Sequence, residues 1–123
     1  YAEYDMAVLP GGMPGTLNLK ADETVRKVAA DFAADENKWM CAICAAPTVL
    51  ADVGLLEGKQ ATCYPAMEPN MMGAVLTHGK VAEDGNIITS QGIGTAIEFS
   101  LTLIEKLKDK QTADEIATGI VYR

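Results

Sequence analysis

Cys44 is the residue of this sequence whose setting best suits a nucleophile. A strand-like apolar run beginning at Met40 leads into Cys44, two alanines follow, and Pro47 begins a helix. A sharp strand-to-helix turn lifts a side chain above a sheet and aims the N–H groups of the next helix at it, which favours a thiolate. We therefore expect Cys44 to act as a nucleophile at the end of a buried strand.

Two other strand-like runs end in loops of small residues. Met6–Leu9 leads into a Pro/Gly loop that contains Gly11 and Gly12, and Asn86–Ile88 leads into a polar loop that contains Gly92. Glycine permits unusual dihedral angles and close approach of the backbone, so such loops can offer N–H groups to a substrate oxygen. Because loops at the carboxyl ends of parallel strands meet at one edge of the sheet, we expect all three loops to form one site.

The other two cysteines admit more than one interpretation. Cys41 and Cys44 have the C-x-x-C spacing of redox pairs, but three residues along a strand place them on opposite faces, which favours a core role for Cys41. Cys63 ends another strand, where it either approaches the pocket or is buried without function. An odd number of cysteines without framework spacing indicates reduced thiols and a cytoplasmic protein.

Candidates for the rest of the pocket are less clear. Tyr64 follows Cys63 directly, and His78, which is the single histidine, precedes a glycine in a polar hairpin region. His78 is either a proton partner of the thiol or a surface residue. Glu98 and Glu105 belong to a helix whose apolar face lies elsewhere, so we expect them at the surface. No cluster of ligand residues has metal-site spacing, and we expect no metal or other cofactor.

Hydrophobic periodicity predicts alternating strands and helices. The predicted elements are strands at 5–9, 38–43 and 59–63, helices at 22–35 and 46–53, a hairpin of 81–83 with 87–89, a helix at 94–108 and a helix from 113 onward. The helix at 94–108 is expected to bury Ile97, Leu101 and Ile104, and Thr112 is expected to cap the last helix.

Composition excludes several classes of protein. The chain has 123 residues, a net charge of −7 and 49% hydrophobic residues. That charge argues against strong nucleic-acid binding, which needs clustered Lys and Arg. No apolar run approaches the roughly 18 residues of a membrane span.

Four segments, in order, carry a resemblance to a known family: YDMAVLPGG at 4–12, AICAAPTVL at 42–50, ATCYP at 61–65 and DGNIITSQGIGTAIEF at 84–99. Together they resemble the ThiJ/PfpI superfamily, in its parkinsonism-associated DJ-1 branch. The resemblance implies a flavodoxin-like, class I glutamine amidotransferase-like α/β fold: a three-layer sandwich with a mostly parallel sheet. Residues 1–123 would be the C-terminal portion of a single domain, which a separate N-terminal segment completes along the exposed edge of the strand at 5–9.

The resemblance also implies a cysteine-dependent glyoxalase or deglycase activity that uses no cofactor. Cys44 would attack a small α-oxoaldehyde such as methylglyoxal to give a hemithioacetal, with the N–H groups of Gly12 and Ala45 holding the oxyanion and a glutamate from outside this chain moving the proton. Ala45 stands where peptidase-like branches carry histidine, which argues against proteolysis. The alternative is that Cys44 is oxidised, as in a stress sensor or redox-regulated chaperone. A homodimer is expected by resemblance.

Overall fold

The computed structural model describes all residues, 1–123, and is built around a four-stranded sheet. The strand order is β1 (Met6–Leu9), β2 (Trp39–Ile43), β6 (Ile87–Ser90) and β5 (Val81–Asp84). β1, β2 and β6 run parallel, while β5 pairs with β6 in the antiparallel direction. The expected mostly parallel sheet and the hairpin of β5 with β6 are therefore confirmed.

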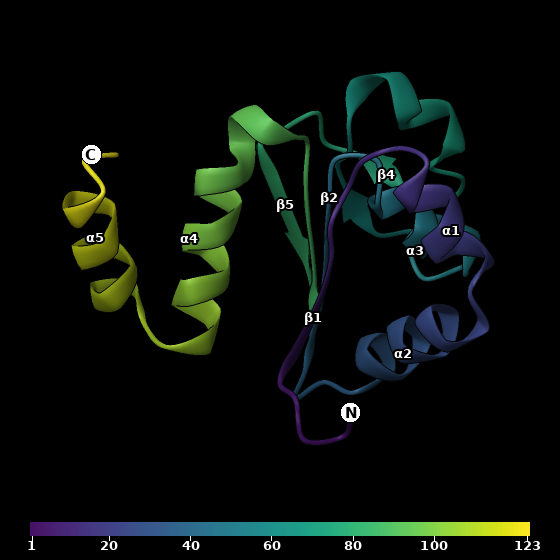
Figure 1. Ribbon diagram of the computed structural model, residues 1–123, viewed down its shortest axis with the longest axis horizontal. Coiled ribbons are helices and arrows are strands. Elements are labelled where there is room, and N and C mark those ends of the chain that lie inside the picture. The colour runs from purple at the N-terminus through teal and green to yellow at the C-terminus, as the bar shows by residue number, and fades with distance from the viewer.

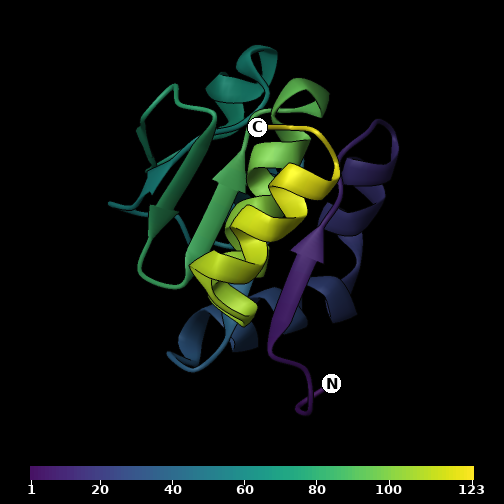
Figure 2. The same cartoon turned by 90° about the vertical axis from the view of Figure 1, so that its left-hand side faces the viewer.

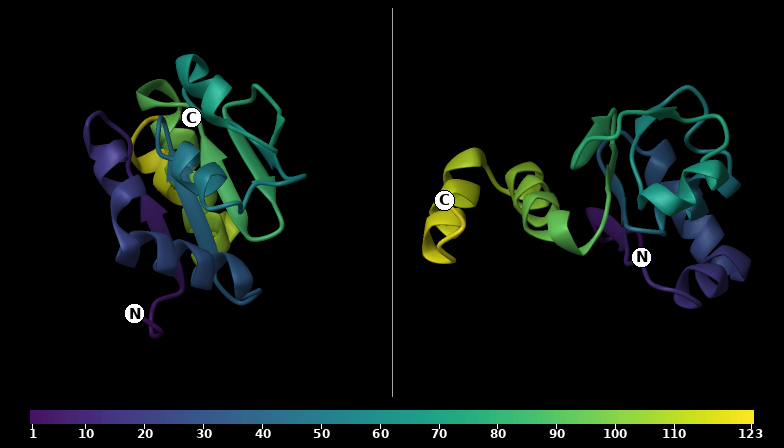
Figure 3. Two further views of the ribbon diagram at one scale, coloured as in Figure 1. Left: turned by 90° about the vertical axis from the view of Figure 1, so that its right-hand side faces the viewer. Right: turned by 90° about the horizontal axis from the view of Figure 1, so that it is seen from above.

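Helices cover both faces of this sheet. α1 (Gly15–Ala21), α2 (Glu23–Ala34) and α3 (Pro47–Asp52) lie on one face, and α4 (Ala96–Leu107) lies on the other (Figure 1). α5 (Lys110–Gly119) packs on the outer side of α4, away from the sheet (Figure 3). The result is the three-layer α/β sandwich that the sequence led us to expect.

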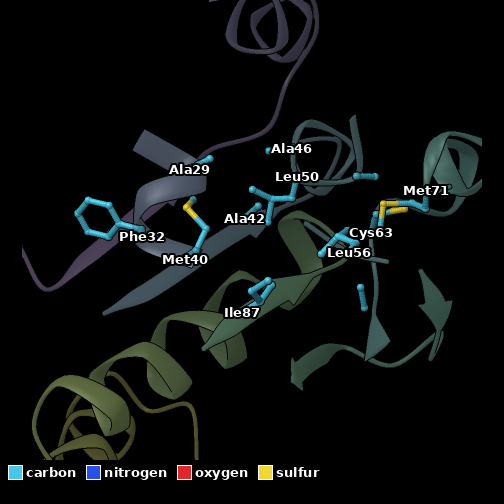
Figure 4. Packing of buried hydrophobic residues seen from close by; sticks show 12 residues of the cluster. Ala29, Phe32, Met40, Ala42, Ala46, Leu50, Leu56, Cys63, Met71 and Ile87 are labelled. Atoms are coloured by element: carbon cyan, nitrogen blue, oxygen red, sulfur yellow. The ribbon is translucent and has the colours of Figure 1, made fainter. Parts of the chain in front are cut away.

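Alternate residues of β2 enter two different cores, as the two-residue period of a strand requires. Met40 and Ala42 point toward α2 and α3, where they meet Phe32 and Leu50 (Figure 4). Cys41 is fully buried on the other face in a smaller cluster with Ile88 and Phe99. Cys41 is therefore a core residue on the face toward α4.

The predicted strand at 59–63 is wrong in its extent. β3 (Gln60–Ala61) has two residues and pairs with β4 (Val75–Leu76) in a separate small sheet, with the 3₁₀ helix η1 (Pro65–Asn70) between them. The strand ends because the Thr62 N–H donates to the Thr89 hydroxyl, 3.0 Å away, instead of to a neighbouring strand.

Three local predictions also need correction. The sequence did not predict α1, because the Pro/Gly loop before it supplies no side-chain cap that would mark the start of a helix. Asp109, rather than Thr112, caps α5, since its carboxylate accepts the Thr112 N–H at 2.7 Å. On α4, Leu101 is buried as predicted and Ile104 is half-buried, but Ile97 is 45% exposed and Phe99 is buried instead.

β1 forms one edge of the sheet, with no strand on its outer side (Figure 2). Its Val8 side chain is exposed although apolar. None of the helices combines the length and apolar character needed to cross a bilayer.

Candidate functional site

Cys44 occupies a strained turn between β2 and α3. Its φ angle is 67°, a value that non-glycine residues seldom adopt and that costs of the order of 1–3 kcal/mol. Two hydrogen bonds hold the turn: the Cys44 N–H donates to the Ser90 carbonyl at 3.0 Å, and its carbonyl accepts the Tyr64 N–H at 2.8 Å. β6 and the segment after β3 thus fix the backbone that presents the thiol.

Gly11 lies against this turn from the end of β1. A Cβ atom at position 11 would stand 2.5 Å from the Cys44 Cβ and 3.0 Å from the Ile43 carbonyl oxygen. Both neighbours belong to rigid parts of the turn, so no side chain fits there without a shift. Glycine at position 11 is therefore a requirement of the Cys44 turn.

Two backbone N–H groups near Cys44 have no partner within the chain. The Gly12 carbonyl accepts the N–H and the hydroxyl of Thr16, at 2.9 and 2.8 Å, but no acceptor is bound to the Gly12 N–H. The Ala45 N–H likewise donates to no group, whereas the Ala46 N–H donates to the Ile43 carbonyl. Both groups remain available as donors to a bound oxygen, and their oxyanion role stays a prediction.

The three loops enclose a cavity of about 390 Å³, which we call the thiol cavity. Its lining joins the ends of β1 and β2 to the loop after β6 and consists of Gly11, Gly12, Ile43, Cys44, Gly92, Ile93 and Ala96. A second cavity of about 310 Å³ on another side of Cys44 is lined by Tyr64, Gln91, Gly92 and Thr95 among others. The predicted gathering of Gly11, Gly12, Gly92 and Tyr64 around Cys44 is present.

Sequence reasoning missed Ile93 and Ala96. Ile93 is 95% exposed and Ala96 begins α4, yet both line the thiol cavity. An isoleucine between two glycines is a signal that could have been noticed, because an exposed β-branched residue in such a loop has no core to fill. Together they make the wall on that side apolar.

His78 does not line either cavity. Its ring Nδ1 lies 2.7 Å from the Glu68 carboxylate, and its side chain is exposed to solvent. Only its carbonyl oxygen faces the site, where it accepts the amide of Gln91 at 3.3 Å. The geometry therefore gives His78 a contact with the pocket wall rather than with the thiol. Glu98 accepts the Tyr122 hydroxyl at 2.7 Å and supports the C-terminus.

The three thiols differ in their environments, and none is in a disulfide. Burial raises the pKa of Cys41 to about 12. Burial, followed by the charges of Glu68 and Cys44, raises the pKa of Cys63 to about 11. Cys63 is fully buried and its thiol lies 3.3 Å from the Tyr64 carbonyl, so the half-buried Cys44 is the accessible thiol.

Other parts of the surface lack these features. A larger cavity along α5 is lined only by polar and charged side chains, from Lys110 to Thr118, and contains no nucleophilic thiol. No group of three His, Cys, Asp or Glu side chains is arranged to hold a metal ion. Of the cavities in this structure, the two beside Cys44 are the ones lined by a thiol.

Known proteins resemble this chain in sequence and in fold. The chain is 42% identical over 123 residues to Protein DJ-1 homolog A of Arabidopsis thaliana, covering 98% of this chain and 31% of the relative. It is 37% identical over 115 residues to the Glutathione-independent glyoxalase DJ-1 of Schizosaccharomyces pombe, covering 90% and 60%. The structure of oxidized Toxoplasma gondii DJ-1 superimposes with a TM-score of 0.89 at 36% identity, covering 96% and 64%.

This chain thus spans less than two thirds of the length of each of these three proteins. The family model described as DJ-1/PfpI family matches residues 1–106, which include β1, the Cys44 turn and the Gly92 loop. The chain belongs to the DJ-1/PfpI family.

Proposed function

We propose that the protein carrying this chain converts small α-oxoaldehydes such as methylglyoxal to hydroxy acids, using Cys44 and no cofactor. The observation that carries the proposal is the strained, accessible Cys44 thiol at the thiol cavity, with the Gly12 and Ala45 N–H groups unbound in the adjoining turns. The relative named a glutathione-independent glyoxalase supports this reaction class.

The reaction would proceed through a covalent adduct. The Cys44 thiolate attacks the aldehyde carbon, and the carbonyl electron pair moves to the oxygen, which the N–H groups of Gly12 and Ala45 stabilise as an oxyanion. Transfer of a proton between the two adjacent carbons converts the hemithioacetal into a thioester of the hydroxy acid. Water then cleaves the thioester and returns the thiol, so methylglyoxal and one water give lactic acid.

The proton transfer needs a group that neither cavity supplies. The lining residues around Cys44 include no carboxylate and no imidazole. We propose that a segment of the same protein outside these residues pairs with the free edge of β1 and contributes the carboxyl group. The exposed Val8 on that edge and the partial coverage of the relatives support this arrangement.

Turnover of methylglyoxal to lactate tests the proposal. The full-length protein is compared with its Cys44→Ser variant under reducing conditions, with Cys41→Ser as a matched control that removes a buried thiol. Lactate formation that disappears only in Cys44→Ser supports the proposal. Equal lactate formation in the parent protein and in Cys44→Ser would refute it.

A second candidate function is redox sensing through Cys44. The relative of known structure that is described as oxidized favours it, and so does the contrast between one accessible thiol and two buried ones. Peroxide would convert the thiolate to a sulfenic and then a sulfinic acid. Peptide mass spectrometry after peroxide treatment tests this candidate, because a sensor gains two oxygen atoms at Cys44 while showing no turnover.

We also propose that the protein is a homodimer. Several apolar side chains are exposed near the thiol cavity, including Met13, Ile93 and Ile97. A contiguous exposed apolar patch is typical of an interface, and these side chains would contribute to one. Light scattering of the full-length protein tests the proposal, and a monomeric mass at micromolar concentration would contradict it.

A further inference from the structure

The Gly92 loop (91–95) is held by two buried hydroxyl groups that the proposed reaction does not use. The Thr95 Oγ1 atom accepts the Gly92 N–H at 3.0 Å and lies 2.7 Å from the Ser90 Oγ atom. The Ser90 hydroxyl in turn donates to the Lys80 carbonyl at 2.6 Å. Both side chains are buried: Ser90 is at 0% and Thr95 at 9% exposure.

The hydrogens available on the two hydroxyl groups determine which group donates in each of these hydrogen bonds. Each hydroxyl has one hydrogen, and the hydrogen of Ser90 is used at the Lys80 carbonyl. The bond between the hydroxyls must therefore take its hydrogen from Thr95. The Thr95 hydroxyl also lies 3.0 Å from the Gly92 carbonyl, but that carbonyl already accepts the Thr95 N–H at 2.9 Å, so we assign the Thr95 hydrogen to Ser90. The chain of donors then runs from the Gly92 N–H through Thr95 and Ser90 to the Lys80 carbonyl.

The end of this chain lies at the thiol. A Cβ atom built on Gly92 would stand 3.9 Å from the Cys44 Sγ atom and 3.7 Å from the Tyr64 ring, and Gly92 lines both cavities beside the thiol. Ser90 also holds the nucleophile directly, since its carbonyl accepts the Cys44 N–H. A displacement of the Gly92 loop would therefore change the space on both sides of the thiol.

We propose that Thr95 and Ser90 are positioning residues that fix the width of the site by locking the Gly92 loop beside Cys44. The inference rests on Cys44 being the reactive group of the proposed function, and it adds what sets the size of the reagent that reaches it. The directed chain also consumes the Gly92 N–H, so this group is not an oxyanion donor. The Gly12 and Ala45 N–H groups stay unbound and remain the proposed donors to the substrate oxygen.

The test measures access to Cys44 rather than turnover alone. In the full-length protein, the rates of Cys44 alkylation by iodoacetamide and by a bulky aryl maleimide are measured, and their ratio reports the width of the site. Thr95→Val removes the hydroxyl and keeps the shape, whereas Thr95→Ser keeps the hydroxyl. Thr62→Val is the matched control, because Thr62 is also buried but its hydroxyl has no partner.

We expect the maleimide-to-iodoacetamide ratio to rise about tenfold in Thr95→Val and to stay within about twofold of the parent in Thr95→Ser and Thr62→Val, because the loop loses its anchor only in the first variant. If Thr95→Val does not fold, Ser90→Ala breaks the same chain one bond later and is expected to raise the ratio in the same direction. An unchanged ratio in whichever of the two variants folds overturns the inference. A raised ratio in a protein that makes no lactate would refute the proposed enzyme and leave the positioning role intact.

Discussion

Gly11→Ala is expected to damage the site more than any other single-methyl change in the loop after β1. The added Cβ would lie 2.5 Å from the Cys44 Cβ, whereas nonbonded carbons pack at roughly 3.5–4.0 Å. Relief requires a movement of at least about 1 Å between the ends of β1 and β2. Overpacking of this kind costs about 1–3 kcal/mol.

The same movement displaces the nucleophile from its neighbouring N–H groups. A misplacement of about 1 Å at a reacting group lowers rates on the order of 100-fold. We therefore expect Gly11→Ala to lower the free energy of unfolding by about 1–3 kcal/mol and the rate of lactate formation by about two orders of magnitude. The stability loss alone would leave most molecules folded at 25 °C, so the activity loss exceeds what unfolding explains.

Gly15→Ala is the matched control for this experiment. It adds the same methyl group four residues later, where nothing lies within 4 Å and α1 begins. Because alanine favours a helix over glycine, we expect it to be neutral or to stabilise by up to about 1 kcal/mol. Urea unfolding and lactate formation are measured on both variants. Equal stability and activity in the two would refute the idea that the Cys44 turn requires glycine at position 11.

Three further predictions test other parts of the fold. Gly92→Ala places a methyl group at ordinary contact distance from Cys44, so we expect the free energy of unfolding to change by no more than about 0.5 kcal/mol. Alkylation of Cys44 by a bulky maleimide should become several-fold slower, and an unchanged alkylation rate would contradict the placement of the Gly92 loop. Asn86→Ala removes a side-chain amide whose two hydrogens are shared among three carbonyls at the end of α2, at 3.0–3.1 Å, so urea unfolding should show a free energy of unfolding lower by about 1–3 kcal/mol. A decrease below about 0.5 kcal/mol, the size expected for a surface change such as Asn18→Ala, would refute this prediction. Because the pKa values of Cys41 and Cys63 are raised to about 12 and 11, the unfolded chain releases these protons at lower pH than the folded chain does. The free energy of unfolding should therefore fall above about pH 9 by up to about 1.4 kcal/mol per pH unit for each cysteine. A variant with both cysteines replaced by alanine should show a smaller slope, and an unchanged slope would show that other groups cause the decrease.

The sequence predicted the parts of the fold that periodicity and chain topology determine. β1, β2 and β6 are short apolar runs whose carboxyl ends must meet in a parallel sheet, so the gathering of Gly11, Cys44 and Gly92 followed from their order alone. The Cys41 prediction succeeded for the same reason, because alternation along β2 admits only one face for each residue.

The predictions were wrong where long-range hydrogen bonds or the rotation of a helix about its axis determine where a strand ends or which side chains are buried. β3 stops at Ala61 because Thr62 donates its N–H to a threonine of β6 that is distant in sequence. Exposure of Ile97 depends on how α4 is turned against the sheet, which a pattern with apolar residues on several sides does not fix. The hydrogen bonds that join Gly92, Thr95 and Ser90 could not be predicted either, since these residues become neighbours only when the loop folds back on β6.

Under the proposed function, two chemical tasks would be divided between this chain and another segment of the protein. Every residue that lines the thiol cavity contributes either backbone, apolar surface or the thiol itself, and Glu68 and His78 bind each other outside it. In the proposed reaction, adduct formation would use only these residues, whereas the later proton transfer would use an added carboxyl group. Replacing that carboxyl by an amide in the full-length protein should leave Cys44 alkylation within about threefold of the parent but reduce lactate formation by about 10²–10⁴-fold, the usual contribution of general acid–base catalysis. Full activity in every such Glu→Gln or Asp→Asn variant would refute this division, because the proton would then have to move through groups of this chain.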